Sequence, residues 1–238
     1  MAGKRPADGP APYVSRAGVK LEHALREFKV DVTGLICADF GCHVGGFTDC
    51  LLQHGAAKVY AIDTGYGVLD YRLRTDPRVV VRERTNVLHA EPPSPCPLPE
   101  GEGASGRVDL VVIDLGWTRQ RHAIPAALRW LGPGGRIISL IKPHYELAGD
   151  EKASLLVDGV LAPQHAEAVV QRVLGEFGGL GAAVTAMTLS PIRGAKSGRR
   201  AGSEGNREYL VGAAKPRGDR PPVEADTLPI DASPDAKI

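Results

Sequence analysis

The sequence of 238 residues has few aromatic residues, 5% of the chain, and only four cysteines. The low aromatic content predicts a core of aliphatic side chains. Four cysteines in a chain of this length do not indicate a disulfide framework. Cys37, Cys42 and Cys50 lie near His43 and His54, but without a C-x-x-C pair we favour ordinary core and loop cysteines over a zinc site. The sequence therefore predicts no bound metal.

Long apolar runs are also absent from the sequence. No run approaches the length that spans a membrane, and the N-terminus lacks the apolar segment of a signal peptide. We therefore expect no membrane association and a location in the reducing cytoplasm.

The chain carries no excess of one charge, because its formal net charge is +1. The total therefore indicates no particular partner, whereas the distribution does. Basic residues gather in two stretches, one with Lys4, Arg5, Arg16 and Lys20 and the other with Arg193, Lys196, Arg199, Arg200 and Arg207. A local basic face on a neutral protein suits a polyanionic partner, and the alternative is a solvated charged loop.

Strand-like and helix-like segments alternate along the chain. The expected strands cover residues 35–40, 58–63, 79–83, 109–115, 136–141, 183–189 and 209–213, and the expected helices cover 15–28, 46–53, 68–74, 121–131 and 163–177. Ser15 is the candidate N-cap of the first helix. The alternation predicts an α/β fold with a mostly parallel seven-stranded sheet and helices that cover it.

Composition also predicts the boundaries of the domain. Residues 1–12 are rich in Pro, Ala and Gly, which predicts a flexible N-terminus, and residues 215–238 have the composition of a disordered tail. One domain over residues 13–214 is left between them. Inside it, residues 89–106 are rich in proline and predict a surface excursion, and residues 193–205 form a basic, glycine-rich insertion.

A glycine-rich turn follows the first expected strand and precedes a helix. Its sequence is Asp39-Phe40-Gly41-Cys42-His43-Val44-Gly45-Gly46-Phe47. Glycines let a backbone approach a ligand closely, and a helix N-terminus offers free N–H groups, so this turn predicts a nucleotide-type cofactor site. The spacing G-x-x-x-G-G differs from the G-x-G-x-x-G of dinucleotide sites and suits S-adenosylmethionine better. Its candidate contacts are Asp39, Gly41, Cys42, Gly45, Gly46 and Phe47.

Polar residues follow the next strands, where an open α/β sheet binds its ligands. A carboxylate at Asp63 can accept hydrogen bonds from both ribose hydroxyls of a nucleoside cofactor. Asn86 and Val87, after the third strand, are placed to contact an adenine edge. The fourth strand ends at Asp114 and the fifth at Lys142. Asp114 is a candidate for both the cofactor and the catalytic site.

Asp114 and Lys142 are charged residues at the ends of apolar strands, so each faces a site or pairs with another group. One interpretation is a structural ion pair at the rim of the sheet. The other is a lysine beside a methyl acceptor, with a pKa that burial and a neighbouring lysine, Lys20, lower enough for it to accept a proton. Glu208 is placed to orient or neutralise one of these lysines.

The residues after the fourth and fifth strands also indicate which kind of group accepts the methyl. The Asn/Asp-Pro-Pro-aromatic loop typical of amine methylation is missing after the fourth strand, and no cysteine nucleophile follows the fourth or fifth strand. A lysine–carboxylate site is suited to removing a proton from an alcohol.

Five stretches, which follow one another in the same order as in the family, resemble the FtsJ-like ribosomal RNA methyltransferases, most closely their haemolysin/TlyA-type branch. They are Tyr13-Val14-Ser15-Arg16-Ala17-Gly18-Val19-Lys20-Leu21, the glycine turn with its helix, Glu83-Arg84-Thr85-Asn86-Val87, Lys142-Pro143-His144-Tyr145-Glu146 and Asn206-Arg207-Glu208-Tyr209-Leu210. The resemblance implies a Rossmann-like S-adenosylmethionine-dependent methyltransferase fold. It also implies ribose 2′-O-methylation of RNA by a Lys-Asp-Lys-Glu tetrad, which falls on Lys20, Asp114, Lys142 and Glu208. The implied partner is ribosomal RNA or a ribosomal subunit.

The sequence departs from this branch in four respects. The glycine turn carries Cys42-His43-Val44 where small residues are more usual, and the insertion with Lys196, Arg199 and Arg200 is longer than expected. The branch usually has an N-terminal S4-type RNA-binding module, whereas about a dozen residues precede the match here, so we expect RNA affinity from elsewhere in the chain or from a partner. Gly116-Trp117 also stands where Ser-Phe is usual. The expected contacts to RNA phosphates are Arg16, Arg193, Lys196, Arg199, Arg200 and Arg207.

Three other functions are compatible with parts of this sequence. One is a methyltransferase fold used as a binding or ribosome-assembly module with little catalysis. Another is O-methylation of a small molecule, which the basic insertion disfavours. A nicotinamide dehydrogenase fits least, because the glycine spacing differs.

Overall fold

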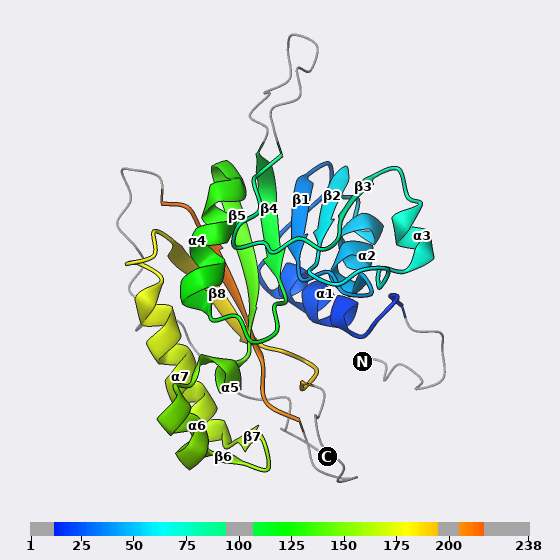
Figure 1. Cartoon of the computed structure of the whole chain (residues 1–238). Helices are drawn as coiled ribbons and strands as arrows, with labels where there is room; N and C mark the ends of the chain where they lie inside the picture. The colour runs from blue at the N-terminus through cyan, green and yellow to red at the C-terminus, as the bar shows by residue number, and fades with distance from the viewer. Residues whose placement is uncertain (1–11, 94–106, 195–204, 217–238) are drawn as a thin grey trace, which may run out of the picture.

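Seven strands form one sheet in the computed structural model, which describes residues 12–93, 107–194 and 205–216 (Figure 1). Their order in space is β3 (Val79–Arg82), β2 (Lys58–Ile62), β1 (Ile36–Phe40), β4 (Val108–Ile113), β5 (Leu131–Ile141), β9 (Tyr209–Ala214) and β8 (Ala183–Leu189). The first five strands pair in parallel, and β9 runs antiparallel to β5 and β8. The predicted, mostly parallel seven-stranded sheet is confirmed.

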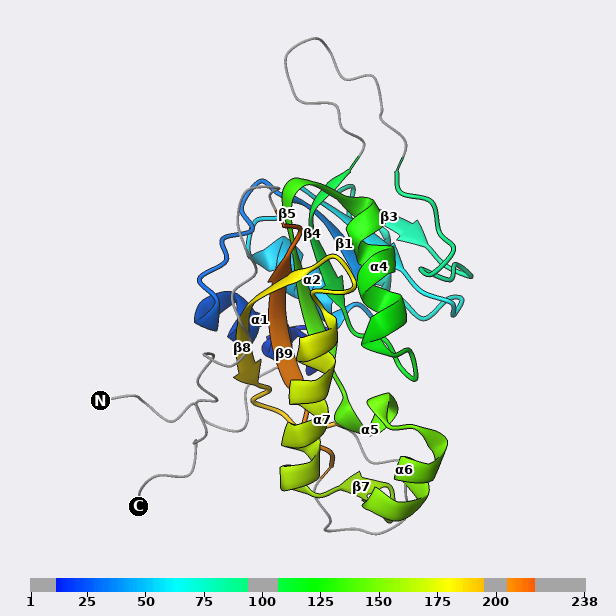
Figure 2. The same cartoon turned by 90° about the vertical axis from the view of Figure 1, so that its left-hand side faces the viewer.

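Helices cover both faces of the sheet (Figure 2). One face carries α1 (Ala17–Glu27), α2 (Gly46–Gln53) and α3 (Tyr71–Arg74), and the other carries α4 (Gln120–Trp130) and α7 (Pro163–Glu176). Strand alternation produces these two cores, because successive side chains point to opposite faces. In β1, Cys37 packs in the core beneath α1 and α2, whereas Phe40 packs in the core beneath α4, edge-on to Trp130.

The first helix buries the predicted apolar stripe but does not begin with Ser15. Leu21, Ala24 and Leu25 are buried against α2 and the sheet. The N-cap is Arg16, and the Ser15 hydroxyl accepts a weak hydrogen bond, 3.3 Å long, from the N–H of Ala17. A Cβ on Gly46 would lie 2.2 Å from the Ser15 hydroxyl, so Ser15 packs over the start of α2.

Several predicted elements have different boundaries in the structure. The helix expected over residues 68–74 is only Tyr71–Arg74, because the Asp70 side chain accepts a hydrogen bond from the N–H of Arg72 and caps the helix there. The second and fourth strands end at Ile62 and Ile113, so Asp63 and Asp114 are the first residues beyond them. Both aspartates therefore lie at the edge of the sheet where the parallel strands end.

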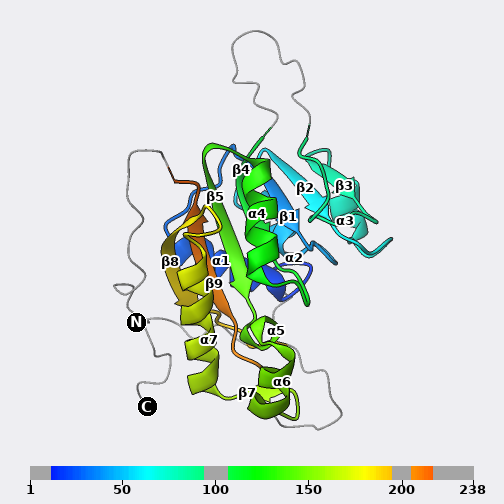
Figure 3. The same cartoon turned by 60° about the vertical axis from the view of Figure 1, so that its left-hand side comes forward.

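A small lobe that the alternation pattern does not predict follows β5. Residues 143–161 form α5 (Pro143–Glu146), α6 (Gly149–Leu155) and a hairpin of β6 (Leu156–Val157) and β7 (Val160–Leu161). This α5–β7 lobe lies beyond the carboxyl end of β5, beside the start of α7 (Figure 3). Asn206 secures the hairpin, because its side chain accepts a hydrogen bond from the N–H of Leu161 and donates one to the carbonyl of Gly159.

None of the helices in the described ranges is long and apolar enough to cross a membrane. The flexible N-terminus predicted over residues 1–12 and the tail predicted over 215–238 lie almost wholly outside the described residues, as do residues 94–106 of the surface excursion. The domain boundaries at residues 13 and 214 stay a prediction.

Candidate active site

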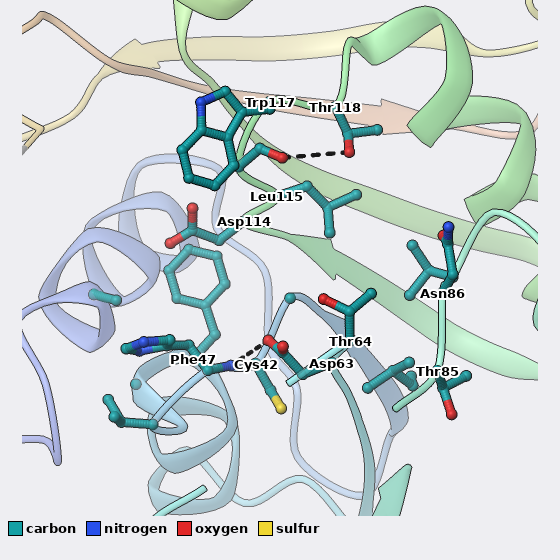
Figure 4. Close-up of a pocket in the computed structure, with 18 of the residues that line it drawn as sticks. Cys42, Phe47, Asp63, Thr64, Thr85, Asn86, Asp114, Leu115, Trp117 and Thr118 are labelled. Atoms are coloured by element: carbon teal, nitrogen blue, oxygen red, sulfur yellow. Dashed lines mark hydrogen bonds between the residues drawn. The ribbon is translucent and has the colours of Figure 1, made fainter. Parts of the chain in front are cut away.

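A pocket of about 540 Å³ lies at the carboxyl ends of β1 to β5 (Figure 4). Of the residues predicted from the sequence to contact a cofactor or act in catalysis, nine line it: Gly41, Cys42, Gly46, Phe47, Asp63, Asn86, Val87, Asp114 and Lys142. Asp39 and Gly45 lie behind this lining. The volume is within the range of roughly 300–1,000 Å³ that small-molecule sites occupy.

The glycine turn forms one wall of the pocket and packs tightly against the loop after β4. Gly41 has a φ of +88°, and a Cβ on it would lie 2.6 Å from the carbonyl oxygen of Asp114. A side chain there is therefore excluded by both torsion and space. Gly45, with a φ of +100°, is the N-cap of α2, whose first N–H groups follow directly.

Cys42 and His43, the unusual residues of this turn, make different contacts. The Cys42 side chain is buried against the core formed by α2 and α3, and this burial raises the pKa of its thiol, which disfavours a nucleophilic thiolate. His43 adopts a left-handed conformation, with a φ of +49°. Its backbone N–H donates a 2.9 Å hydrogen bond to Oδ2 of Asp63.

Asp63 is held in place by the backbone on both sides. Oδ2 accepts the N–H of His43, and Oδ1 accepts the N–H of Gly65 at 2.7 Å. Figure 4 shows the first of these bonds as a dashed line and places Asp63 across the pocket from Trp117. Each carboxylate oxygen has a further lone pair, so Asp63 has acceptor capacity left for a ligand in a fixed orientation.

Asp39 lies under the glycine turn and is completely buried. The hydroxyl of Thr48 donates a 2.7 Å hydrogen bond to Oδ2, while Oδ1 has no hydrogen-bond partner among the described residues. Burial raises the pKa of Asp39 to about 7, with Thr48 opposing the rise and Asp114 adding to it. Asp39 does not line the pocket, and a direct contact of this carboxylate with a cofactor stays a prediction.

Lys142 and Asp114 meet in the pocket, where 2.5 Å separates Nζ of the lysine from Oδ1 of the aspartate. Burial lowers the pKa of Lys142, but its attraction to Asp114 and, more weakly, to Glu208 outweighs this effect. The net pKa lies above its ordinary value. The expectation of a lowered pKa is therefore wrong for this arrangement, because the carboxylates stabilise the ammonium form more than burial disfavours it.

Lys20 and Glu208 form a second ion pair with a separation of 2.5 Å, deeper in the protein. Their side chains are 7% and 4% exposed, and neither lines the pocket. The pair links α1 to the residues just before β9. Glu208 is one of the charges that acts on Lys142, so the two pairs are electrostatically connected. The four predicted residues are thus arranged as two ion pairs, of which one is open to the pocket.

Trp117 lines the pocket and was not among the predicted site residues. The residue is 81% exposed, and its ring lies 5.8 Å, centroid to centroid, from that of Tyr145. The backbone of Trp117 is left-handed, with a φ of +56°. The sequence signal was a tryptophan three residues after the strand-end aspartate Asp114, in a loop at the edge of the sheet where open α/β folds bind their ligands.

The predicted RNA-contacting residues have different surroundings. Arg16 is exposed beside Ser15 and Ala17, which line the pocket. Arg207 forms a 2.9 Å ion pair with Glu167 of α7, which neutralises much of its charge. Arg193 donates a long hydrogen bond to the carbonyl of Gly205, and Lys196, Arg199 and Arg200 lie outside the described residues.

The groups that line the pocket fit S-adenosylmethionine. Asp63 offers a fixed carboxylate for ribose hydroxyls, and Gly41 and Gly46, which carry no side chains, line the pocket with backbone. Within the described ranges, no group of three or more His, Cys, Asp or Glu side chains is placed to hold a metal ion.

Comparison with known proteins gives a consistent result. The sequence model of the FtsJ-like methyltransferase family matches residues 13–215. YqxC of Bacillus subtilis, named as a candidate rRNA methyltransferase, is 37% identical over 203 residues, which are 85% of this chain and 66% of YqxC. The 16S/23S rRNA (cytidine-2′-O)-methyltransferase TlyA of Mycobacterium tuberculosis is 43% identical over 140 residues, 59% of this chain and 49% of TlyA. The chain thus spans from about half to just under two thirds of the length of these relatives.

Solved structures agree with the sequence comparisons. A candidate haemolysin from Streptococcus thermophilus superimposes with a TM-score of 0.77 at 32% identity, covering 92% of this chain and 72% of the other. A candidate haemolysin from Lactococcus lactis gives a TM-score of 0.73 at 34% identity, covering 87% and 90% of the two chains.

Proposed function

Since the chain belongs to the FtsJ-like methyltransferase family, whose members use S-adenosylmethionine, we propose that it methylates the 2′-hydroxyl of a ribose in RNA, with ribosomal RNA as the substrate. The observation that carries this proposal is the Lys142–Asp114 pair, which lies in the same pocket as the glycine turn and Asp63. The names of YqxC and TlyA support RNA as the substrate class, and that of TlyA supports the ribose oxygen as the acceptor.

The two ends of the pocket have different tasks in this proposal. Asp63 accepts hydrogen bonds from the ribose of the cofactor, the backbone of Gly41 and Gly46 borders it closely, and Asn86 and Val87 contact the adenine. When bound, S-adenosylmethionine would supply an electrophilic methyl group, with its S–C bond broken and the neutral thioether S-adenosylhomocysteine as the leaving group. Lys142 and Asp114, at the other end, face the acceptor hydroxyl. The protein's main contribution is to align these two ends and to exclude other geometries.

Lys142 removes the proton of the acceptor hydroxyl as the new O–C bond forms. An ammonium group cannot accept this proton, so the reactive form of the enzyme has neutral Lys142. Asp114 holds the amine at the pocket wall before the transfer and stabilises the ammonium that forms afterwards. Deprotonation of Lys142 is therefore part of the kinetic barrier, because its pKa is raised.

Lys20 and Glu208 support this step from below the pocket. Their charges nearly cancel, and Glu208 adds to the negative potential that Lys142 experiences. We assign Lys20 to the orientation of Glu208 and, through it, to the electrostatics of the acceptor end.

The test is transfer of label from methyl-tritiated S-adenosylmethionine to deproteinised ribosomal RNA and to isolated ribosomal subunits, followed by analysis of the modified nucleosides. We expect label in a 2′-O-methylated nucleoside, and a loss of roughly 10²–10⁴-fold in rate for Lys142→Ala, the typical contribution of a general base. Lys58→Ala, an exposed lysine at the start of β2, is the control and retains activity. Normal cofactor binding without transfer to any RNA would contradict the proposal.

A further inference from the structure

Glu146 takes no direct part in the proposed chemistry, yet the residue is only 8% exposed. Carboxylates are rarely buried without a partner. Its Oε1 accepts a 2.9 Å hydrogen bond from the backbone N–H of Gln120, the first residue of α4. The N-cap of α4, Arg119, makes no side-chain capping bond, so a residue from another segment completes this helix end.

A second hydrogen bond runs the opposite way between the same two segments. Nη2 of Arg119 donates a 2.7 Å bond to the carbonyl oxygen of Leu147, which directly follows Glu146. The side chain of each segment therefore binds the backbone of the other. We call these two bonds, Glu146 to Gln120 and Arg119 to Leu147, the loop clamp.

The loop clamp continues into the sheet through buried polar side chains. The hydroxyl of Ser139, in β5, donates a 2.8 Å hydrogen bond to Oε1 of Gln120. Ser139 is 0% and Gln120 4% exposed. Such buried hydrogen bonds favour a single arrangement, because any other leaves these polar groups unsatisfied.

The two clamped segments are those that carry the open ion pair. Asp114 begins the segment that ends at Gln120, and Lys142 begins the segment that ends at Glu146. Between these ends the two segments also meet directly, because Nζ of Lys142 donates a 3.4 Å hydrogen bond to the carbonyl of Leu115 and the ring of Trp117 lies 5.8 Å from that of Tyr145. The loop clamp adds to these contacts at the far end of the loop and so limits how far the loop after β4 moves relative to Lys142.

We propose that Glu146 is a positioning residue, and this inference rests on the proposed function. Glu146 keeps the Asp114 carboxylate and the Lys142 amine at the relative positions that proton removal requires. Its action is through the start of α4 and not through contact with substrate. A cap that served α4 alone would affect stability without changing the rate of methyl transfer, so the two roles are separable.

Three variants distinguish these roles. Glu146→Ala removes the acceptor for the N–H of Gln120, whereas Glu146→Gln keeps an oxygen in the same place. Burial already raises the pKa of Glu146, with the N–H of Gln120 and the charge of Arg119 opposing, so an uncharged acceptor suits this site. The matched control is Glu151→Ala, which removes a carboxylate of the α5–β7 lobe that binds Arg172 and the N–H of Ala148 instead of α4.

The first measurement is the rate of methyl transfer to ribosomal RNA with saturating cofactor. For Glu146→Ala we expect kcat to fall roughly ten- to hundredfold, because displacement by an ångström is enough to cost this much, with KM for S-adenosylmethionine nearly unchanged. Glu146→Gln restores most of the rate, and Glu151→Ala retains it. Equal rates for Glu146→Ala and Glu146→Gln would overturn the proposal.

The second measurement is hydrogen–deuterium exchange of the RNA-free proteins, which needs no activity. We expect Glu146→Ala to accelerate exchange in residues 114–122 as well as in 142–148, and Glu151→Ala to leave 114–122 unchanged. Unaltered exchange in residues 114–122 of Glu146→Ala would overturn the link between the loops. If the wild type transfers no methyl group, the proposed function fails, and the exchange data still decide whether the loop clamp exists.

Discussion

Lys142 and Asp114 form an ion pair, 2.5 Å between Nζ and Oδ1, at the ends of two neighbouring parallel strands. Their side chains are 16% and 19% exposed, so the pair is reached from the pocket while most of each side chain is shielded. Each charge offsets the desolvation of the other. The protein thus holds its proposed base in the protonated form, and this property has measurable consequences.

The first consequence is a dependence of the rate on pH. The pKa of Lys142 is raised above its ordinary 10.5 because the attraction of Asp114 outweighs burial, so the neutral amine is a minor species at neutral pH. We expect kcat/KM for RNA to rise about tenfold per pH unit between roughly pH 6 and 9. A plateau that begins near pH 7 would show that a group of lower pKa is the base. Cofactor binding measured over the same range is the control.

The buried pair of Lys20 and Glu208 allows stability and activity to be separated. Lys20→Ala leaves the Glu208 carboxylate buried without its partner, and we expect the free energy of unfolding to fall by about 3–5 kcal/mol. The double variant Lys20→Met with Glu208→Leu recovers most of this loss, because no charge remains buried. Urea unfolding and methyl transfer are measured on both. If the double variant is stable and fully active, the pair is structural only.

Gly41 and Gly67 provide a matched pair of substitutions in the left-handed region. Gly41→Ala adds a Cβ at 2.6 Å from a backbone oxygen, whereas Gly67→Ala, at a φ of +71°, meets nothing within 4 Å. We expect Gly67→Ala to cost only the torsional term, about 1–2 kcal/mol, and to bind S-adenosylmethionine normally. Gly41→Ala loses cofactor affinity as well. Calorimetric titration with the cofactor checks this, and equal affinities would refute the close packing of the turn.

Trp117 is exposed at the pocket and is placed to stack on a base of the substrate. We expect Trp117→Ala to weaken RNA binding by about 1–3 kcal/mol, the range for base–aromatic stacking, and Trp117→Phe to retain most of the affinity. Thermal stability should not change, because the residue is 81% exposed. Tyr71→Ala removes another exposed ring, outside the pocket lining, and serves as the control. Equal binding by all variants would exclude stacking on Trp117.

The basic insertion predicts a dependence on salt. Replacing Lys196, Arg199 and Arg200 by glutamine should weaken RNA binding and reduce the slope of log K against log[salt] by roughly 0.7–0.9 for each RNA phosphate that the variant no longer neutralises. Cofactor affinity should stay the same. Filter binding at several salt concentrations measures the slope, and an unaltered slope would identify the segment as a solvated loop. Arg207 is a weaker candidate, because Glu167 already pairs with it.

The sequence was sufficient for the sheet, the glycine turn and most members of the site. Buried parallel strands are continuous apolar runs, and their ends are marked by single charged residues such as Asp63, Asp114 and Lys142, so local pattern and site coincide. Ser15 shows where local reasoning failed. Its residue type predicts a helix cap, but close packing against Gly46 decides its position.

The tertiary structure alone decided which charges meet. The sequence left open whether Asp114 pairs with Lys142 and which lysine Glu208 meets, and it did not predict that the pKa of Lys142 is raised. These properties depend on distances and burial that arise only when β4, β5, α1 and the start of β9 pack together. The α5–β7 lobe and its loop clamp could not be predicted from the sequence either, since their short elements are held by long-range hydrogen bonds. The sequence by itself determined the kinds of groups at the sheet edge, through periodicity and composition. Packing determined their pairing and protonation, because electrostatic energies depend on distance and solvent exposure.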